Sequence, residues 1–269
     1  METARHDDIE IAYETFGTGQ PLLLIMGINS QGMAWPDGFC AALAARGFAV
    51  TRFDNRDTGL STHFDQPYRL EDMALDAIAV LDALGCDSAH VVGVSMGGAI
   101  AQALTVEHPG RVRSLTSMMS WSNPRTMNPS PELLQLLAKE FEDSVEGAQD
   151  QAVYVYGLLG SPGYPPDEQW IRAVAKLSWE RAHDPTAIGR HAAAVEATGD
   201  LRARVAGIEV PTLVLHGEDD PFVTIGAGQE TAAIIPGARF VSYPGLGHDL
   251  PRELWPSFVE EIASVAGRD

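Results

Sequence analysis

The sequence AHVVGVSMGG (residues 89–98) decides the fold of this chain. Its first six residues form an apolar run typical of a fully buried strand, and a helical pattern begins at Ala99. Between them Ser95 is flanked by Gly93 and Gly97, which gives the order strand, G-x-S-x-G, helix. A side chain at either glycine would collide with the neighbouring strand or helix. We therefore predict a strained nucleophile elbow that exposes the Ser95 hydroxyl over the sheet edge.

The elbow also predicts the surroundings of that hydroxyl. A serine at a helix N-terminus lies beside free backbone amides, so the amide of Met96 can face an oxygen that becomes negative during acyl transfer. The alternative is a glycine-rich turn with an incidental serine. The strand before the motif and the helix after it argue against that alternative.

A strand–helix rhythm surrounds the elbow. Apolar or alternating runs predict strands, and stretches with helical spacing that end at Gly or Pro predict helices. The predicted strands are 9–15, 21–26, 48–53, 89–94, 112–119, 210–215 and 238–243, and the predicted helices are 39–45, 70–84, 99–108, 222–235 and 252–265. Such alternation implies right-handed crossovers and a mostly parallel sheet with helices on both faces.

One segment breaks the rhythm. After residue 122 no strand is predicted before residue 210, and helices are predicted at 132–157 and 167–197 with a proline-rich link between them. We therefore predict an α/β core of residues 1–122 and 205–269. Residues 123–204 are predicted to form a helical cap inserted after the strand 112–119, in the place of the fold's sixth strand.

Bulk properties limit the partners. The 269 residues include 18 Lys and Arg against 37 Asp and Glu, a formal net charge of −19, which argues against nucleic acid and anionic membrane. No run approaches the roughly 18 apolar residues of a spanning helix, and residues 1–8 do not resemble a secretory signal. Cys40 and Cys86 are expected to be free thiols, so we predict a cytoplasmic protein. Gly226-Ala227-Gly228 does not follow a strand, and no metal-binding pattern is present, so no cofactor or metal is predicted.

A serine nucleophile needs a base, and the base needs an orienting carboxylate. His248 follows the last strand between glycines that give its loop freedom to reach Ser95, whereas His90 lies at the wrong end of its strand. The chain order serine, acid, histidine matches this kind of fold. We predict His248 as the base.

The acid is expected in the loop after residue 215, which offers Glu218, Asp219 and Asp220. We prefer Asp220, which lies just before a proline and past the turn glycine, and keep Asp219 as the alternative. His216 in the same loop is interpreted as structural.

The second oxyanion donor should be a backbone amide after the strand 21–26. We choose Ile28, with Gly27 leaving room for close approach. Arg56 and Asp57 follow another strand, and we interpret them as an ion pair that braces their loop rather than as substrate contacts.

Several motifs together resemble a known family. The elbow at 92–98 and the loops 54–59 and 216–220 look like the α/β-hydrolase superfamily, and segments 26–27, 32–36 and 56–61 look most like aclacinomycin methylesterases and related actinobacterial carboxylesterases. The resemblance implies a small helical cap and hydrolysis of a carboxylic ester, including a methyl ester on an anthracycline-type polyketide. It assigns Ser95 as nucleophile, Asp220 as acid and His248 as base. Met26 departs from the pattern, because a histidine often precedes the first oxyanion glycine.

We therefore expect a serine hydrolase of small, apolar or aromatic esters that works through an acyl-enzyme. Gly27, Trp35, Trp121 and Tyr154 are the candidate substrate-binding residues. Cap aromatics form either a lid over the substrate or the core of the cap; these are Tyr154, Tyr156, Tyr164, Trp170 and Trp179. Lactone or carbon–carbon bond hydrolysis, cofactor-free perhydrolysis and a non-catalytic binding module are the alternatives.

Overall fold

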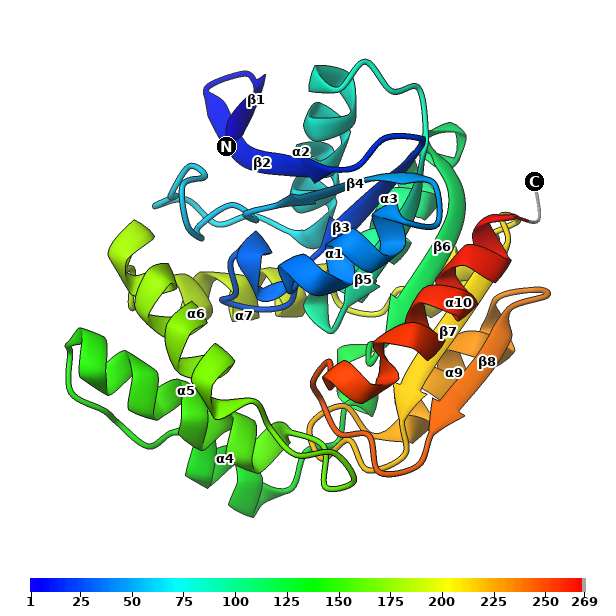
Figure 1. Cartoon of the computed structure of the whole chain (residues 1–269). Coiled ribbons are helices and arrows are strands. Elements are labelled where there is room, and N and C mark those ends of the chain that lie inside the picture. Colours follow the sequence, from blue (N-terminus) through cyan, green and yellow to red (C-terminus); the bar gives the residue numbers. More distant parts are fainter. Residues whose placement is uncertain (268–269) are drawn as a thin grey trace.

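In the computed structural model, which describes residues 1–267, the strands form one sheet in the order β1-β2-β4-β3-β5-β6-β7-β8 (Figure 1). Strands β3 to β8 are parallel to one another, and β1 and β2 add an antiparallel edge. The strands are β1 Glu2–His6, β2 Ile9–Phe16, β3 Gln20–Ile25, β4 Phe48–Phe53, β5 Ala89–Val94, β6 Val112–Met118, β7 Thr212–Gly217 and β8 Arg239–Tyr243. The predicted α/β class with a mostly parallel sheet is confirmed.

Helices cover both faces of the sheet. Helices α1 (Asp37–Ala44) and α10 (Trp255–Ala266) pack on one face, and α2 (Leu70–Ala83), α3 (Met96–Glu107) and α9 (Ile225–Ile234) pack on the other (Figure 1). Strand β3 shows why a strand covered on both faces carries a continuous apolar run. Leu22 and Leu24 belong to the core under α1 and α10, while Leu23 and Ile25 belong to the core under α2 and α3. Successive side chains of the strand point to opposite faces of the sheet.

The chain between β6 and β7 is helical. It forms α4 (Pro131–Leu137), α5 (Val145–Leu159), α6 (Glu168–Arg181), α7 (Ala187–Thr198) and the short α8 (Arg202–Val205). The two long helices predicted here are each divided in two. Ser144 caps α5 by accepting the amide of Gly147, and Pro185 separates α6 from α7 because proline cannot continue a helix.

The first strand was not predicted. Strand β1 pairs with β2 across a turn at Asp7 and Asp8, where Asp7 has a φ of +50°. Asp tolerates the positive φ of such a turn, but Asp7-Asp8 lacks the glycine of the strong hairpin signals. The segment before it has a single buried position, Ala4, and so carries little apolar alternation. Short 3-10 turns complete the chain at Gly32–Ala34, Pro109–Arg111, Pro124–Thr126 and Arg252–Leu254.

None of the helices within residues 1–267 combines the length and the apolar character needed to cross a bilayer.

Candidate active site

Ser95 lies at the elbow between β5 and α3, with φ +55° and ψ −124°. A Cβ on Gly93 would lie 2.1 Å from the carbonyl oxygen of Gly97, and a Cβ on Gly97 would lie 2.2 Å from that of Ile25. Both distances are far below van der Waals contact, so the turn closes only with glycine at these positions. The predicted collision of a side chain at either glycine with the neighbouring backbone is therefore confirmed.

Neighbouring strands hold this strained residue in place. The amide of Ser95 donates to the carbonyl of Met118 at 2.9 Å, and the Ser120 hydroxyl donates to the carbonyl of Ser95 at 2.7 Å. A positive φ costs a non-glycine residue on the order of 1–3 kcal/mol, and it persists where surrounding contacts over-determine the backbone. The hydroxyl is thus fixed at the C-terminal edge of the sheet.

The structure brings Ser95, His248 and Asp220 together. The His248 ring lies with Nε2 at 3.0 Å from Ser95 Oγ and with Nδ1 at 2.6 Å from Asp220 Oδ2. A carboxylate only accepts, so Nδ1 carries the proton and Nε2 presents its lone pair to the serine hydroxyl. This is the tautomer that a general base requires.

The preferred acid and its alternative have different partners. Asp220 is fully buried in its side chain, and its Oδ1 accepts the amides of Phe222 at 2.9 Å and Val223 at 2.8 Å, which leaves Oδ2 for the histidine. Asp219, the alternative acid, instead accepts the amide of Gly245 at 2.8 Å. His216 is buried and donates from Nε2 to the Val223 carbonyl at 2.8 Å, and burial lowers its pKa.

The loop that carries His248 is tied to the end of α5 and to the segment after it. The amide of His248 donates to the Leu159 carbonyl at 2.7 Å, and the amide of Gly247 donates to Ser161 Oγ at 2.9 Å. The Gly163 amide donates to the Gly245 carbonyl at 2.9 Å. The position of the imidazole therefore depends on the inserted helices as well as on β8.

The predicted oxyanion residues face the serine. Ile28 and Met96 line the same cavity as Ser95, and within residues 1–267 neither backbone amide donates a hydrogen bond to the protein. A Cβ on Gly27 would lie 3.2 Å from the Ser95 Cβ, so glycine here leaves room beside the nucleophile. Met26 is held by its carbonyl, which accepts Asn55 Nδ2 at 2.9 Å.

The prediction that Arg56 and Asp57 pair with each other is wrong. Arg56 binds Asp76 of α2 through two contacts, at 2.6 and 2.7 Å, and Asp57 binds Arg190 of α7 at 2.9 Å. Burial alone would raise the pKa of Asp57, but hydrogen bonds from Arg190 and Tyr68 hold it below its ordinary value. Both residues brace the loop, each to a different helix, and not to each other.

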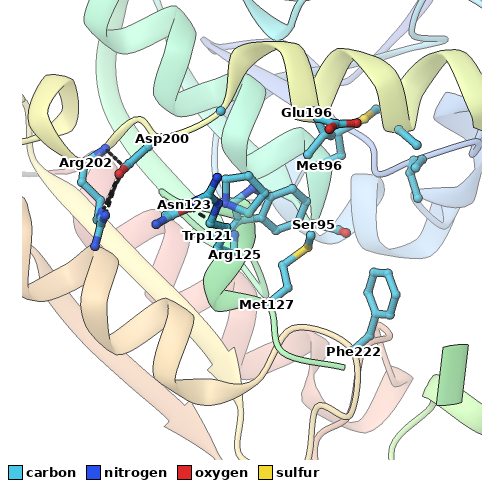
Figure 2. Close-up of a pocket in the computed structure, with 15 residues that line it drawn as sticks. Ser95, Met96, Trp121, Asn123, Arg125, Met127, Glu196, Asp200, Arg202 and Phe222 are labelled. Atoms are coloured by element: carbon cyan, nitrogen blue, oxygen red, sulfur yellow. Dashed lines mark hydrogen bonds and ion pairs between the residues drawn. The ribbon is translucent and has the colours of Figure 1, made fainter. Parts of the chain in front are cut away.

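A cavity of about 640 Å³ opens above Ser95. Figure 2 shows Trp121, Met127 and Phe222 around the serine, and the ion pair of Asp200 with Arg202 at the opposite end. The wall around the nucleophile is thus largely apolar and aromatic, but it also carries the charged side chains of Arg125 and Glu196, and the Asp200–Arg202 pair lies farther away. Of the candidate substrate-binding residues, Trp121 lines this cavity.

Trp35 and Tyr154 lie elsewhere, which corrects the prediction for both. Trp35 is fully buried in the core under α1, where its ring stacks on Phe39 at 5.6 Å between centroids. Tyr154 packs against Phe141 at 5.5 Å, outside the residues that line the cavity. Sequence marks both as aromatic, but aromatic character does not say which side of an element faces the site.

Contacts among the other aromatic residues of the predicted cap favour the core of these helices over a lid. Tyr156 meets Trp170 edge to face between α5 and α6 at 6.3 Å, and Trp179 stacks on His183. Tyr164 packs with the apolar residues under α10. None of the five predicted lid residues is part of the cavity wall in the described chain.

Sequence reasoning assigned no role to His191. This side chain on α7 is fully buried and contacts the backbone at Asn29 and Arg56, in the loops after β3 and β4. Nothing in the local pattern of α7 indicates these partners, which lie more than 130 residues away in the sequence.

Comparisons with known proteins agree with this architecture. A family model described as alpha/beta hydrolase fold matches residues 20–251. Rhodomycin D methylesterase DauP of Streptomyces sp. (strain C5) is 32% identical, and rhodomycin D methylesterase DnrP of Streptomyces peucetius is 31% identical, each over 91% of both chains. The crystal structure of a hydrolase from Pseudomonas aeruginosa is similar with a TM-score of 0.78 and 28% identity, over 99% of this chain and 98% of that one.

Proposed function

The chain belongs to the α/β-hydrolase family and is a carboxylic ester hydrolase, and we propose that it works through a serine triad and an acyl-enzyme. The observation that carries the proposal is the continuous contact from Asp220 through His248 to Ser95, at 2.6 and 3.0 Å. A serine hydroxyl is a poor nucleophile until an adjacent base removes its proton. Two contacts support this role for His248: its Nε2 lies within hydrogen-bond distance of Ser95 Oγ, and its Nδ1 contact with Asp220 favours the tautomer that a base requires.

The proposed reaction has two halves. In the first, His248 takes the Ser95 proton while Oγ attacks the ester carbonyl, and the ring then returns that proton to the departing alcohol. In the second, His248 takes a proton from water, the resulting hydroxide attacks the acyl-enzyme, and Ser95 recovers its proton as the acid leaves. Asp220 holds the ring orientation and stabilises the imidazolium in both halves.

The amides of Ile28 and Met96 are the proposed oxyanion hole. Both residues line the cavity beside Ser95, and both amides are free of protein acceptors within the described chain. Preorganised donors of this kind are each worth roughly 3 kcal/mol of transition-state stabilisation. These are backbone groups, so their contribution is reached only by changing what holds their loops.

We propose a methyl ester of an aromatic polyketide as the substrate class. The two curated relatives reported above are named for methyl-ester hydrolysis of rhodomycin D. In this chain Trp121 and Phe222 give the cavity wall beside Ser95 the flat, apolar surface that a fused aromatic ring system would bury. Residues 1–122 and 205–269 are the proposed hydrolase core, and 123–204 the proposed cap.

Two measurements test the proposal. A fluorophosphonate probe should modify Ser95 in the wild type, as read by intact mass and peptide mapping, and Ser95→Ala should abolish both labelling and turnover of p-nitrophenyl butyrate. The enzyme should then release one methanol for each free carboxylate that it forms from an anthracycline methyl ester. The rate of this hydrolysis should exceed the rate for a lactone of similar size. Full activity of Ser95→Ala would refute the triad, and faster lactone cleavage would refute the substrate class.

A further inference from the structure

We propose that His191, on cap helix α7, is a positioning residue that holds the loop carrying the Ile28 amide. The inference rests on the proposed function of that amide as an oxyanion donor. It assigns to the cap a part in building the catalytic site, in addition to covering it.

The contacts of His191 define its role. Nδ1 lies 3.0 Å from the amide nitrogen of Asn29, and Nε2 lies 2.9 Å from the carbonyl oxygen of Arg56. A backbone amide only donates and a carbonyl only accepts, so Nδ1 accepts and Nε2 carries the proton. Both ring nitrogens are therefore satisfied by backbone groups from two different loops.

The ring must stay neutral to do this. Burial lowers the pKa of His191 below its ordinary value, and its side chain is fully enclosed. A protonated ring would present an N–H to the Asn29 amide in place of the lone pair. The neutral form is thus the one that both contacts and the burial favour.

The local backbone shows why the Asn29 contact reaches Ile28. Asn29 has a φ of +54°, the amide of Ser30 donates to the Gly27 carbonyl at 3.4 Å, and Ser30 Oγ donates to the Ile28 carbonyl at 3.2 Å. The peptide that joins Ile28 to Asn29 is therefore held through its C=O by Ser30 and through its N–H by His191. Rotation of that peptide changes ψ of Ile28 and re-aims the turn that presents the Ile28 amide.

A purely structural role is the competing explanation, because any buried histidine between a helix and two loops helps to dock the helix. Helix α7 supplies a matched control. Thr198 lies on the same helix, is also buried, and accepts the amide of Leu70 at 2.8 Å, so it docks α7 on α2 without contacting the oxyanion loop. A structural role predicts that both residues affect the enzyme in the same way.

Two substitutions separate the two contacts of the ring. In His191→Asn the amide oxygen takes the place of Nδ1 and keeps an acceptor for the Asn29 amide. In His191→Gln the amide nitrogen reaches the place of Nε2 and keeps the donor to the Arg56 carbonyl, but the Asn29 amide loses its acceptor. The pair therefore tests which contact matters to catalysis, with Thr198→Val as the control for docking.

The test is to measure, for the wild type and the three variants, kcat and KM for p-nitrophenyl butyrate and the inhibition constant of a trifluoromethyl ketone. Active sites are counted with the fluorophosphonate probe. Removal of an oxyanion donor costs roughly 100- to 1,000-fold in kcat, so its misplacement in His191→Gln should cost roughly 10- to 100-fold. KM should change less than about threefold. The inhibition constant of the trifluoromethyl ketone should rise by the same factor by which kcat falls. His191→Asn and Thr198→Val should retain kcat within about threefold.

Nitrogen-15 NMR of the wild type gives a readout that needs no variant, and it should find Nδ1 of His191 unprotonated and Nε2 protonated at pH 7. A protonated Nδ1, an unchanged kcat in His191→Gln, or equal losses in the Asn and Gln variants would overturn the inference. These results leave the labelling of Ser95 in the wild type intact. Absence of that labelling would instead overturn the proposed function, and this inference with it.

Discussion

Replacement of Asp220 by Asn should inactivate the enzyme without unfolding it. In the wild type Oδ1 accepts two backbone amides and Oδ2 accepts His248 Nδ1 at 2.6 Å. The asparagine oxygen is the atom able to accept from those amides, so its NH₂ group will face Nδ1. Two donors cannot share that distance, and the imidazole must move its proton to Nε2.

The size of the effect follows from the tautomer. With a proton on Nε2, the ring no longer accepts from Ser95 Oγ, which lies 3.0 Å away, and general-base catalysis is lost. The corresponding change in a well-studied serine protease lowers kcat by about 10⁴, which corresponds to about 5 kcal/mol of transition-state stabilisation. We expect a similar loss here, because no other carboxylate within the described chain contacts Nδ1.

The assay is steady-state turnover of p-nitrophenyl butyrate, with circular dichroism to confirm folding and Asp219→Asn as the matched control. Asp219 accepts the exposed amide of Gly245 at 2.8 Å, and an asparagine oxygen still accepts it, so the control should lose less than about threefold. Equal losses in the two variants would contradict the assignment of the acid. So would an Asp220→Asn enzyme within tenfold of the wild type.

Three further predictions test the framework around the site. Stability to urea should fall as pH drops below about 6.5, by up to about 1.4 kcal/mol per pH unit each for His191 and His216, because burial lowers both pKa values and the unfolded chain then binds more protons; a flat profile between pH 7 and 5.5 would contradict this. Ser161→Ala should lower kcat by less than about tenfold at nearly constant KM, since two backbone bonds still hold the histidine loop; a change in KM alone would argue against a positioning role. Gly97→Ala should destabilise the fold by more than about 3 kcal/mol in thermal unfolding, whereas Gly110→Ala, with open space around its Cβ position, should be nearly neutral; similar melting temperatures would refute the steric argument.

The sequence predicts the elbow and its partners well because each has a local physical cause. Gly93 and Gly97 are required by backbone atoms within a few ångströms, and an apolar run followed by such a turn has few other structures open to it. His248 and Asp220 follow because parallel strands end at one edge, so residues just past them share a site. The edge strand β1 was not predicted, because an exposed edge strand needs little apolar pattern.

Side-chain partners in the cap and the neighbouring loops were not predictable in the same way. Trp35 is aromatic and close in sequence to Gly27, yet it faces the core under α1 rather than the cavity. Arg56 and Asp57 carry opposite charges side by side, but each meets a different helix. Composition and periodicity specify burial and charge, whereas these pairings depend on the docking of α2 and α7, which no local pattern encodes.

That docking links the proposed cap to both the base and the oxyanion loop of the proposed mechanism. Leu159, at the end of α5, and Ser161 after it hold the His248 loop, and α7 holds the loop of Ile28 through His191. Arg181 of α6 also binds the buried Asp54, whose Oδ1 accepts the amide of Gly32 at 2.8 Å. Outward displacement of the cap would break contacts to the base and to the oxyanion loop together. Cap substitutions at these contacts should therefore change kcat, whereas substitutions in the cavity wall, such as at Trp121, should act mainly on KM for bulky esters.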